Sequence, residues 1–218
     1  MISRSYQIRL CLNPGCELRY PLLVGSPFGE RCPHCRSETE AVAQHGFAPE
    51  PEKTPSVLHP PLEAFLDNVR SAWNVGSMFR TADGLGLSRL YLGGISPTPE
   101  NPKVAKTSLG AEASVAWEYH PDGVQLARRL IDSGRSLWAL ECTPDAVPLT
   151  GIPGSSPEAG VVLVVGNENF GVDPDILSLC ERKLCIPMEG RKRSLNAAVA
   201  FGVAVYGLRT ALAGSKPG

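Results

Sequence analysis

Short apolar runs alternate with longer segments of helical periodicity from residue 62 to the end of the chain. The alternation predicts an α/β domain in which helices cover a mostly parallel sheet. Buried strands are expected at 89–95 ("RLYLGGI"), 136–142 ("SLWALEC"), 160–166 ("GVVLVVG") and 183–188 ("KLCIPM"). Helices are expected at 75–86, 122–134, 173–181 and 194–213.

Residue types at the ends of these helices support the assignment. Asp122 and Asp173 stand where an N-cap is needed, and Gly134 stands where a helix stops. The last segment, 194–213, is apolar nearly all round, so we expect it to be buried or to pack against a partner.

The N-terminal segment is marked by cysteines instead of apolar runs. The stretches "CLNPGC" and "CPHC" are typical of two turns that each offer two thiolates to one tetrahedral ion. They predict a structural zinc site, with iron as an alternative ion and unrelated core thiols as the alternative without a metal. His34 lies between two of the cysteines and is expected to face solvent. The predicted ligands are Cys11, Cys16, Cys32 and Cys35.

A proline-rich stretch separates this module from the α/β domain. Residues 47–61 read "FAPEPEKTPSVLHPP", and prolines with charges at this density exclude a helix or a central strand. The sequence therefore predicts a zinc-ribbon-like module at 1–46, a linker at 47–61 and a second domain at 62–218.

Net charge and the lengths of the apolar runs limit the kinds of partner and compartment that are expected. A formal net charge of −1 argues against bulk electrostatic capture of nucleic acid, so any RNA contact must be local. No apolar run approaches the roughly 18 residues of a membrane span, and the N-terminus lacks the apolar region of a secretory signal. A cytoplasmic protein without disulfides is expected, in which Cys142, Cys180 and Cys185 are small buried apolar residues.

Two common nucleotide motifs are absent. The loop "GNENFGV" has glycines five apart, but no Lys-Ser/Thr follows, so it is not a phosphate-binding P-loop. The stretch "GLGLSR" lacks the third glycine of a dinucleotide fingerprint. An unrelated nucleotide-dependent enzyme is therefore disfavoured.

Three polar clusters lie beside the apolar elements, where open α/β sheets bind ligands. The first, "WNVGSMFRTADGLG", contains Asn74 and Arg80, and the asparagine can cap a helix that starts near Val75. The second, "VVGNENFGV", places Asn167 and Glu168 just past a buried strand. The third, "IPMEGRKRSLN", presents three cations before a helix that we expect to begin at Ser194.

In content, order and spacing, these clusters resemble the three signature motifs of the SpoU/TrmH family of RNA ribose 2'-O-methyltransferases. The resemblance covers roughly residues 62–213. It implies a SPOUT fold whose C-terminal part forms a deep trefoil knot, bound S-adenosylmethionine and a homodimer. Rules of chain topology alone would not predict a knot.

The resemblance also implies roles for individual residues. Catalytic positions are matched by Asn74, Arg80, Glu168, Ser194 and Asn196. Cofactor-binding positions are matched by Leu140, Gly166, Ile186, Met188 and Leu195. We expect Arg191, Lys192 and Arg193 to hold RNA phosphates near the methyl donor.

Alternatives remain at several positions. Arg80 is a base, as often proposed for the family, a partner of an RNA backbone phosphate, or a stabiliser of the developing alkoxide. Trp73 stands where the family commonly has proline, and Arg193 where it often has an acid, so the RNA preference of a relative does not transfer. The function expected is methylation of a ribose 2'-hydroxyl in tRNA or rRNA, and the alternative is a non-catalytic RNA-binding protein that keeps the fold. The N-terminal module would dock RNA or support the dimer.

Overall fold

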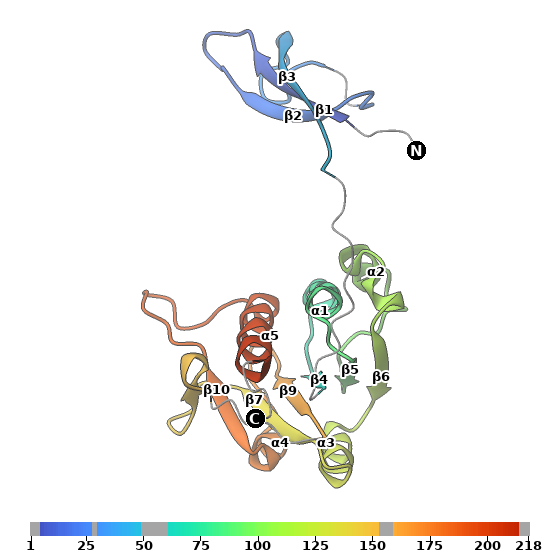
Figure 1. Ribbon diagram of the computed structural model, residues 1–218, viewed down its shortest axis with the longest axis vertical. Coiled ribbons are helices and arrows are strands. Elements are labelled where there is room, and N and C mark those ends of the chain that lie inside the picture. Colours follow the sequence, from blue (N-terminus) through green and yellow to red (C-terminus); the bar gives the residue numbers. More distant parts are fainter. Residues whose placement is uncertain (1–4, 28–29, 49–60, 153–158, 214–218) are drawn as a thin grey trace. The chain divides into compact units, whose positions relative to one another are not determined.

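A computed structural model describes residues 5–27, 30–48, 61–152 and 159–213. The chain divides into two compact units, Met1–Pro55 and Ser56–Gly218 (Figure 1). Most of the predicted linker, residues 49–60, lies outside the described residues.

The N-terminal unit is a three-stranded antiparallel sheet with the strand order β2-β1-β3. Its strands are β1 (Ser5–Cys11), β2 (Arg19–Leu23) and β3 (Thr39–Gly46). Among its described residues, the buried side chains are Cys11, Cys32 and Arg9, while Leu23 and Phe47 are more than half exposed. The Arg9 guanidinium donates to Thr39 Oγ1 at 2.8 Å and to the Thr39 carbonyl at 2.8 Å, so this buried cation is satisfied. Such a unit has too little apolar burial for a core of its own.

The second unit is built on a seven-stranded sheet with the order β6-β5-β4-β9-β7-β10-β8. Every pairing between these strands is parallel, which confirms the predicted sheet. The strands are β4 (Leu62–Asp67), β5 (Arg89–Gly93), β6 (Ala116–His120), β7 (Ser136–Leu140), β8 (Val147–Pro148), β9 (Val161–Val165) and β10 (Arg182–Cys185).

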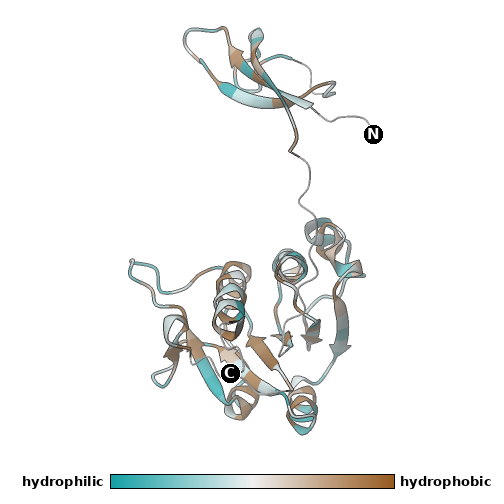
Figure 2. Cartoon of the chain, viewed as in Figure 1, coloured by the Kyte–Doolittle hydropathy of each residue, from teal (hydrophilic) through white to brown (hydrophobic). Residues whose placement is uncertain are grey.

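Helices cover both faces of this sheet. In Figure 1, α1, α2 and α5 lie on one side of the strands, and α3 and α4 lie on the other. Figure 2 shows that the strands and α5 carry most of the apolar colour, and two apolar clusters fill the layers above and below the sheet. None of the helices in the described ranges is long and apolar enough to cross a bilayer. The helices are α1 (Ala72–Leu85), α2 (Pro102–Ser108), α3 (Gly123–Asp132), α4 (Pro174–Leu179) and α5 (Ala197–Ala213), with short 3-10 turns at Ala111–Ala113 and Leu149–Gly151.

The pattern of apolar residues missed β4, which lies at the centre of the sheet between β5 and β9. Glu63 and Asp67 interrupt its apolar run, yet both side chains are buried. Arg135 Nε donates to Glu63 at 2.5 Å, and the Asp173 backbone N–H donates to Asp67 at 2.8 Å. These hydrogen-bond donors come from distant segments of the chain. Because they satisfy both buried carboxylates, a sequence that is typical of a half-exposed strand can form a buried strand of the sheet.

Helix ends confirm several predictions. Asp122 accepts from the Gln125 backbone N–H at 3.0 Å, and Asp173 accepts from the Asp175 backbone N–H at 2.8 Å. Gly134 follows the end of α3 with a φ of +86°, a conformation that favours glycine.

Two other helix starts were predicted wrongly. Helix α1 is capped by Ser71, so Asn74 lies inside the first turn and does not cap it. Helix α5 begins at Ala197, and its cap is Asn196, whose Oδ1 accepts from the Ala198 N–H at 3.0 Å. Ser194 therefore precedes the helix. In both places the sequence offers two residues that can cap, and packing selects the other one.

The cysteines of the second unit also differ from the prediction. Cys142 and Cys185 form a disulfide with a Cα–Cα distance of 4.7 Å, and Cys142 is exposed. Only Cys180, which is half-buried and free, resembles the predicted small apolar residue. The prediction rested on the expectation that cytoplasmic thiols stay reduced, and nothing in the local sequence marks the pairing, since 43 residues separate the two thiols.

Candidate active site

A hydrogen-bonded network joins the loop after β9 to the first turn of α1. The Glu168 carboxylate accepts from the backbone N–H of Arg70 at 2.9 Å and from that of Ser71 at 3.0 Å. The amide of Asn74 donates to the same carboxylate at 2.9 Å. An acidic group is favoured here because backbone N–H groups and the helix dipole converge at a helix N-terminus.

Asn196 extends this network to the start of α5. Its Nδ2 donates to Asn74 Oδ1 at 3.1 Å, while its Oδ1 caps the helix. Three of the five predicted catalytic side chains, from residues 74, 168 and 196, thus meet although more than 90 residues separate the first two. Both asparagine side chains are fixed in orientation by these contacts.

The environment of Glu168 sets its protonation state. Burial acts to raise its pKa, but the hydrogen bonds from the Arg70 and Ser71 N–H groups and from Asn74 lower it below the ordinary value. The group is therefore ionised at neutral pH, and its oxygens are already engaged. Glu168 is suited to holding Asn74 and the start of α1 in place, and poorly suited to accepting a proton.

Arg80 lies apart from this network. It follows Asn74 by six residues on α1, which places it about 9 Å further along the helix axis. Its exposed side chain lines a hollow of about 620 Å³ with Ser77, Lys106 and Thr107, which we call the basic hollow. Within one chain, the described structure does not bring Arg80 to the other catalytic candidates.

Two adjoining depressions lie at the carboxyl ends of β7, β9 and β10. The first, about 180 Å³ in volume and here called the apolar depression, is lined by the predicted cofactor residues Leu140, Ile186, Met188 and Leu195. The second, about 560 Å³ and here called the polar depression, includes Gly166, Glu168, Ser194 and Asn196. The two share residues Leu140, Glu141, Ser194, Leu195 and Ala200.

Gly166 has a packing reason to be glycine. A Cβ at this position would lie 2.2 Å from the Gly171 carbonyl oxygen and 2.2 Å from the Val172 nitrogen. The loop after β9 therefore folds back directly over Gly166. This contact is independent of any ligand, although Gly166 also lines the polar depression.

Two further residues organise this loop. Buried Asn167 donates from Nδ2 to the Asn68 carbonyl at 2.7 Å, and its Oδ1 accepts from the Asn169 N–H at 2.9 Å. Glu141 lines both depressions and accepts from the Val172 N–H at 3.2 Å. The position of Asn167 after a buried strand was a usable signal, whereas nothing in the local sequence marks Glu141.

Comparison with known proteins agrees with this geometry. The family model described as the SpoU rRNA Methylase family matches residues 61–206. The chain belongs to this SpoU family. The match includes every residue of the network and of both depressions.

Named relatives of this SpoU protein modify RNA ribose. It is 30% identical over 147 residues to the tRNA (guanosine(18)-2'-O)-methyltransferase of Thermus thermophilus, covering 67% of this chain and 73% of the relative. It is also 30% identical over 177 residues to the 23S rRNA (guanosine(2553)-2'-O)-methyltransferase RlmP of Bacillus subtilis, covering 73% and 65%.

Solved structures share the fold. An AdoMet-bound rRNA methyltransferase from Sinorhizobium meliloti matches with a TM-score of 0.66 and 26% identity, covering 71% of this chain and 58% of that one. The SpoU methyltransferase AviRb from Streptomyces viridochromogenes, in complex with AdoMet, matches with a TM-score of 0.64 and 27% identity, covering 73% and 63%. The matched region spans less than two thirds of each solved chain.

Of the three cations predicted to hold RNA, Arg193 reaches one of the depressions of this SpoU protein. Arg191, Lys192 and Arg193 are exposed in a segment without helix or strand between β10 and α5. Arg193 also lines the apolar depression. The segment therefore presents positive charge at the apolar depression through Arg193.

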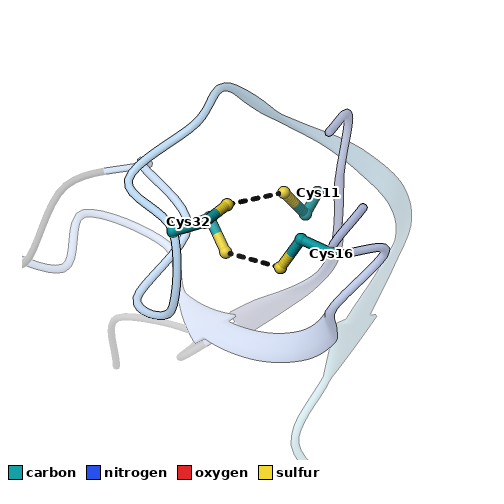
Figure 3. Close-up of side chains that lie close together, drawn as sticks. Cys11, Cys16 and Cys32 are labelled. Atoms are coloured by element: carbon teal, nitrogen blue, oxygen red, sulfur yellow. Dashed lines mark hydrogen bonds between the residues drawn. The ribbon is translucent and has the colours of Figure 1, made fainter. Parts of the chain in front are cut away.

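The cysteine cluster lies in the N-terminal unit, outside the SpoU match. The sulfur atoms of Cys11, Cys16, Cys32 and Cys35 all lie within 4.8 Å of one another. Figure 3 shows the side chains of Cys11, Cys16 and Cys32 pointing toward one another. The Sγ distances are 3.4 Å from Cys11 to Cys35 and 3.8 Å from Cys16 to Cys32. A tetrahedral ion with metal–sulfur bonds of about 2.3 Å requires sulfur separations of about 3.8 Å, so the cluster fits zinc. His34 is exposed as predicted, although its Nδ1 lies 3.4 Å from Cys16 Sγ.

Proposed function

We propose that this protein transfers a methyl group from S-adenosylmethionine to a ribose 2'-hydroxyl of tRNA or rRNA. The observation that carries the proposal is the network of Asn74, Glu168 and Asn196, two of which line the polar depression that adjoins the apolar one, in a chain of the SpoU family. Since tRNA and rRNA are cytoplasmic, we propose that the protein acts in the cytoplasm.

The two depressions suit the methyl donor. Leu140, Ile186, Met188 and Leu195 offer apolar surface to an adenine ring, and in this proposal their backbone groups would read its edge. Gly166 and Ser194 line the polar depression, where the charged end of the donor would lie. When bound, S-adenosylmethionine supplies an electrophilic methyl group.

The polar side chains would act on the RNA ribose. A neutral hydroxyl is a poor nucleophile, so the site must orient it and stabilise the negative charge that develops on its oxygen. Asn74 and Asn196 are held rigidly, and exposed Ser194 lies beside them at the shared edge of the depressions. We assign charge stabilisation to Arg80, because a guanidinium stays protonated at neutral pH. Phosphates of the RNA would bind Arg191, Lys192 and Arg193.

A homodimer would bring Arg80 into the site. One stripe of α5 exposes Val199 (53%), Val203 (44%) and Tyr206 (65%), at helical spacing and opposite the buried face of the helix. Burial of such a stripe by a second copy would join two helical layers, and Arg80 of one chain would then complete the network of the other. The trefoil knot of the SPOUT fold belongs to the same proposal, supported by the TM-scores with members of the family.

For the N-terminal unit we propose a structural zinc ion bound by the four cysteines, with domain limits of 1–46 and 62–218 around the linker. The support is the sulfur geometry and the small apolar content of this unit. A metal would supply the stability that burial does not.

The test is methyl transfer from labelled S-adenosylmethionine to tRNA and rRNA purified separately from cells that lack this gene. The proposal expects label in one fraction and saturable donor binding. Donor binding without transfer to either fraction would contradict the substrate assignment. Absence of both binding and transfer would favour the non-catalytic RNA-binding protein.

A further inference from the structure

The disulfide lies in the wall of the apolar depression. Cys142 follows β7 by two residues, and Cys185 is the last residue of the neighbouring strand β10. Cys142 itself lines the depression, together with Leu140 beside it and Ile186 beside Cys185. The bond thus joins two segments that form opposite parts of the proposed adenine site.

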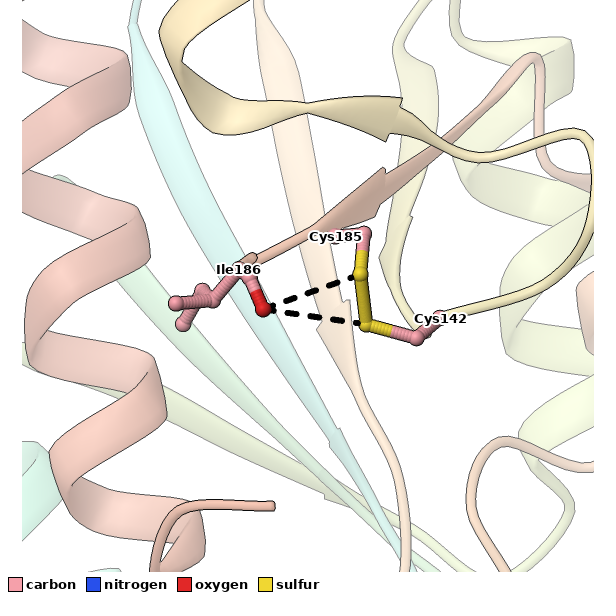
Figure 4. Close-up of a disulfide and its surroundings, with 3 residues drawn as sticks. All are labelled: Cys142, Cys185 and Ile186. Atoms are coloured by element: carbon pink, nitrogen blue, oxygen red, sulfur yellow. Dashed lines mark hydrogen bonds between the residues drawn. A yellow bond between two sulfur atoms is a disulfide. The ribbon is translucent and has the colours of Figure 1, made fainter. Parts of the chain in front are cut away.

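Ile186 is held against the disulfide. Its carbonyl oxygen lies 3.7 Å from Cys185 Sγ and 4.0 Å from Cys142 Sγ, as Figure 4 shows. Neither sulfur carries a hydrogen in the disulfide, so these are packing contacts and the carbonyl is not hydrogen-bonded through them. Reduction would convert both sulfurs to thiols and change the surroundings of a backbone group that we assign to the donor.

Apart from the disulfide, noncovalent contacts hold the segment after β7: β8 pairs in parallel with β10, and the Glu141 carboxylate accepts from the Val172 N–H at 3.2 Å. The Glu141 N–H donates to the Leu184 carbonyl at 3.0 Å, and Lys183 pairs with Asp145 at 2.7 Å. The ion pair is partly exposed, so it contributes little to stability. Strand β8, which ends this segment, has two residues, both exposed. The covalent link is therefore the strongest restraint on this part of the wall.

The sulfur of Cys142 is accessible to an attacking thiolate. Cys142 is exposed and Cys185 is half-buried, so attack at Cys142 Sγ breaks the sulfur–sulfur bond and releases Cys185 as a thiolate, which takes a proton from water. A second thiol then attacks the mixed disulfide, frees Cys142 and leaves as an oxidised thiol pair. Two thiols supply the two electrons. Cys180 differs, because burial raises its pKa to about 12 and leaves little reactive thiolate.

We propose that Cys142 and Cys185 are a redox-modifiable site, whose disulfide and dithiol forms give the donor site two different affinities. The reductant would be a cellular thiol or dithiol. The disulfide form preorganises the wall, so it binds the donor more tightly. This inference rests on the proposed function, since it assumes that the apolar depression receives S-adenosylmethionine.

The test compares the full chain with its disulfide intact and after treatment with a dithiol, each state verified by mass spectrometry of the peptides that contain the two cysteines. Reduction should raise the Kd for S-adenosylmethionine by about three- to tenfold in calorimetry. The double variant Cys142→Ser/Cys185→Ser should match the reduced form and should not respond to the dithiol. Cys180→Ser, the matched control, should respond as the wild type does.

Equal affinities in the two forms would overturn the proposal. A dithiol response that persists in the double variant would also overturn it, because the effect would then come from the N-terminal cysteines. Hydrogen exchange of residues 141–148 and 184–188 without donor separates this inference from the proposed function. Faster exchange after reduction, with no donor binding in either form, would reject the donor site and keep a redox-dependent wall, whereas unchanged exchange would reject the wall as well.

Discussion

The two units of this chain are held together in different ways. The second unit buries aromatic and branched side chains on both faces of a seven-stranded sheet, among them Phe65, Phe79 and Trp138. Within residues 5–27 and 30–48, the N-terminal unit has three strands, and the apolar side chains buried there are those of Cys11 and Cys32 from the cysteine cluster. One fold is thus specified by an apolar pattern, and we propose that the other is specified by four cysteines spaced to bind a metal ion.

This contrast predicts its largest effect for Cys32→Ser. Loss of one ligand should unfold the N-terminal unit, because binding of a structural zinc contributes on the order of 10 kcal/mol to such a module. Hydrogen exchange should show full loss of protection at 5–46 with unchanged protection in the second unit. The zinc content should fall below the value of about one ion per chain that is expected for the wild type. The control variant Cys180→Ser should keep that zinc content. A folded, metal-free N-terminal unit would reject the zinc site.

Phe79→Ala tests the other half of this contrast, the stabilisation of the second unit by apolar burial. Phe79 is fully buried between α1 and the sheet, so its truncation should lower the free energy of unfolding of the second unit by about 3–5 kcal/mol. Urea unfolding monitored separately for the two units should show no change in the N-terminal one. A loss shared equally by both units would mean that they fold together.

We assign methyl transfer to the second unit, and the variant Arg80→Ala tests this assignment. Methyl transfer should fall by at least about 100-fold while the Kd for S-adenosylmethionine changes little, because Arg80 lies outside both depressions. Arg128→Ala, an exposed arginine on α3, should have no effect. Near wild-type activity of Arg80→Ala would remove it from the catalytic site.

Mixing two inactive variants then asks whether the site is shared between chains. Arg80→Ala and Asn196→Ala chains that exchange in a homodimer should regain about a quarter of the wild-type activity, because half of the dimers would have one intact site. No recovery after verified exchange would place Arg80 with the network of its own chain.

Glu168→Gln should have the smallest effect on the free energy of unfolding. The pH dependence of this effect has a definite sign. The pKa of Glu168 is lowered in the folded protein, so its carboxylate stabilises the fold above the ordinary carboxyl pKa, and this contribution is lost as the pH falls through the folded value. At pH 7 the variant should be less stable by about 0.5–1 kcal/mol. The difference from wild type should shrink below about pH 4. A difference that is constant from pH 7 to pH 3 would contradict the assigned cause.

Residue patterns predicted the second unit well where each element is self-sufficient. Strands β7 and β9 and helix α3 follow directly from apolar runs and caps such as Asp122. Strand β4 was missed because the partners of Glu63 and Asp67 come from segments far along the chain. The disulfide was missed because cytoplasmic thiols were expected to stay reduced, and its two thiols meet only when β7 and β10 pair.

The candidate site was predicted through resemblance more than through local chemistry. Motif spacing indicated Asn74, Glu168 and Asn196, and their hydrogen bonds bring them together. The separate functions of these residues could not be inferred from the sequence. Asn196 also caps a helix, and Glu168 also accepts a hydrogen bond from the backbone N–H of Ser71 at the start of α1. The distance of Arg80 from Asn74 follows from helix geometry. Its consequence, that a second chain would have to bring Arg80 to the network, became visible only once the position of the network was known.

The most direct test of the central claim is the chemical position of the transferred methyl group. RNA labelled by the wild-type protein should be hydrolysed with alkali, which needs a free 2'-hydroxyl to cleave the neighbouring phosphodiester. The proposed function predicts label in alkali-resistant dinucleotides, because a 2'-O-methyl group blocks that cleavage. Label released entirely in mononucleotides would place the methyl group on a base and contradict ribose methylation.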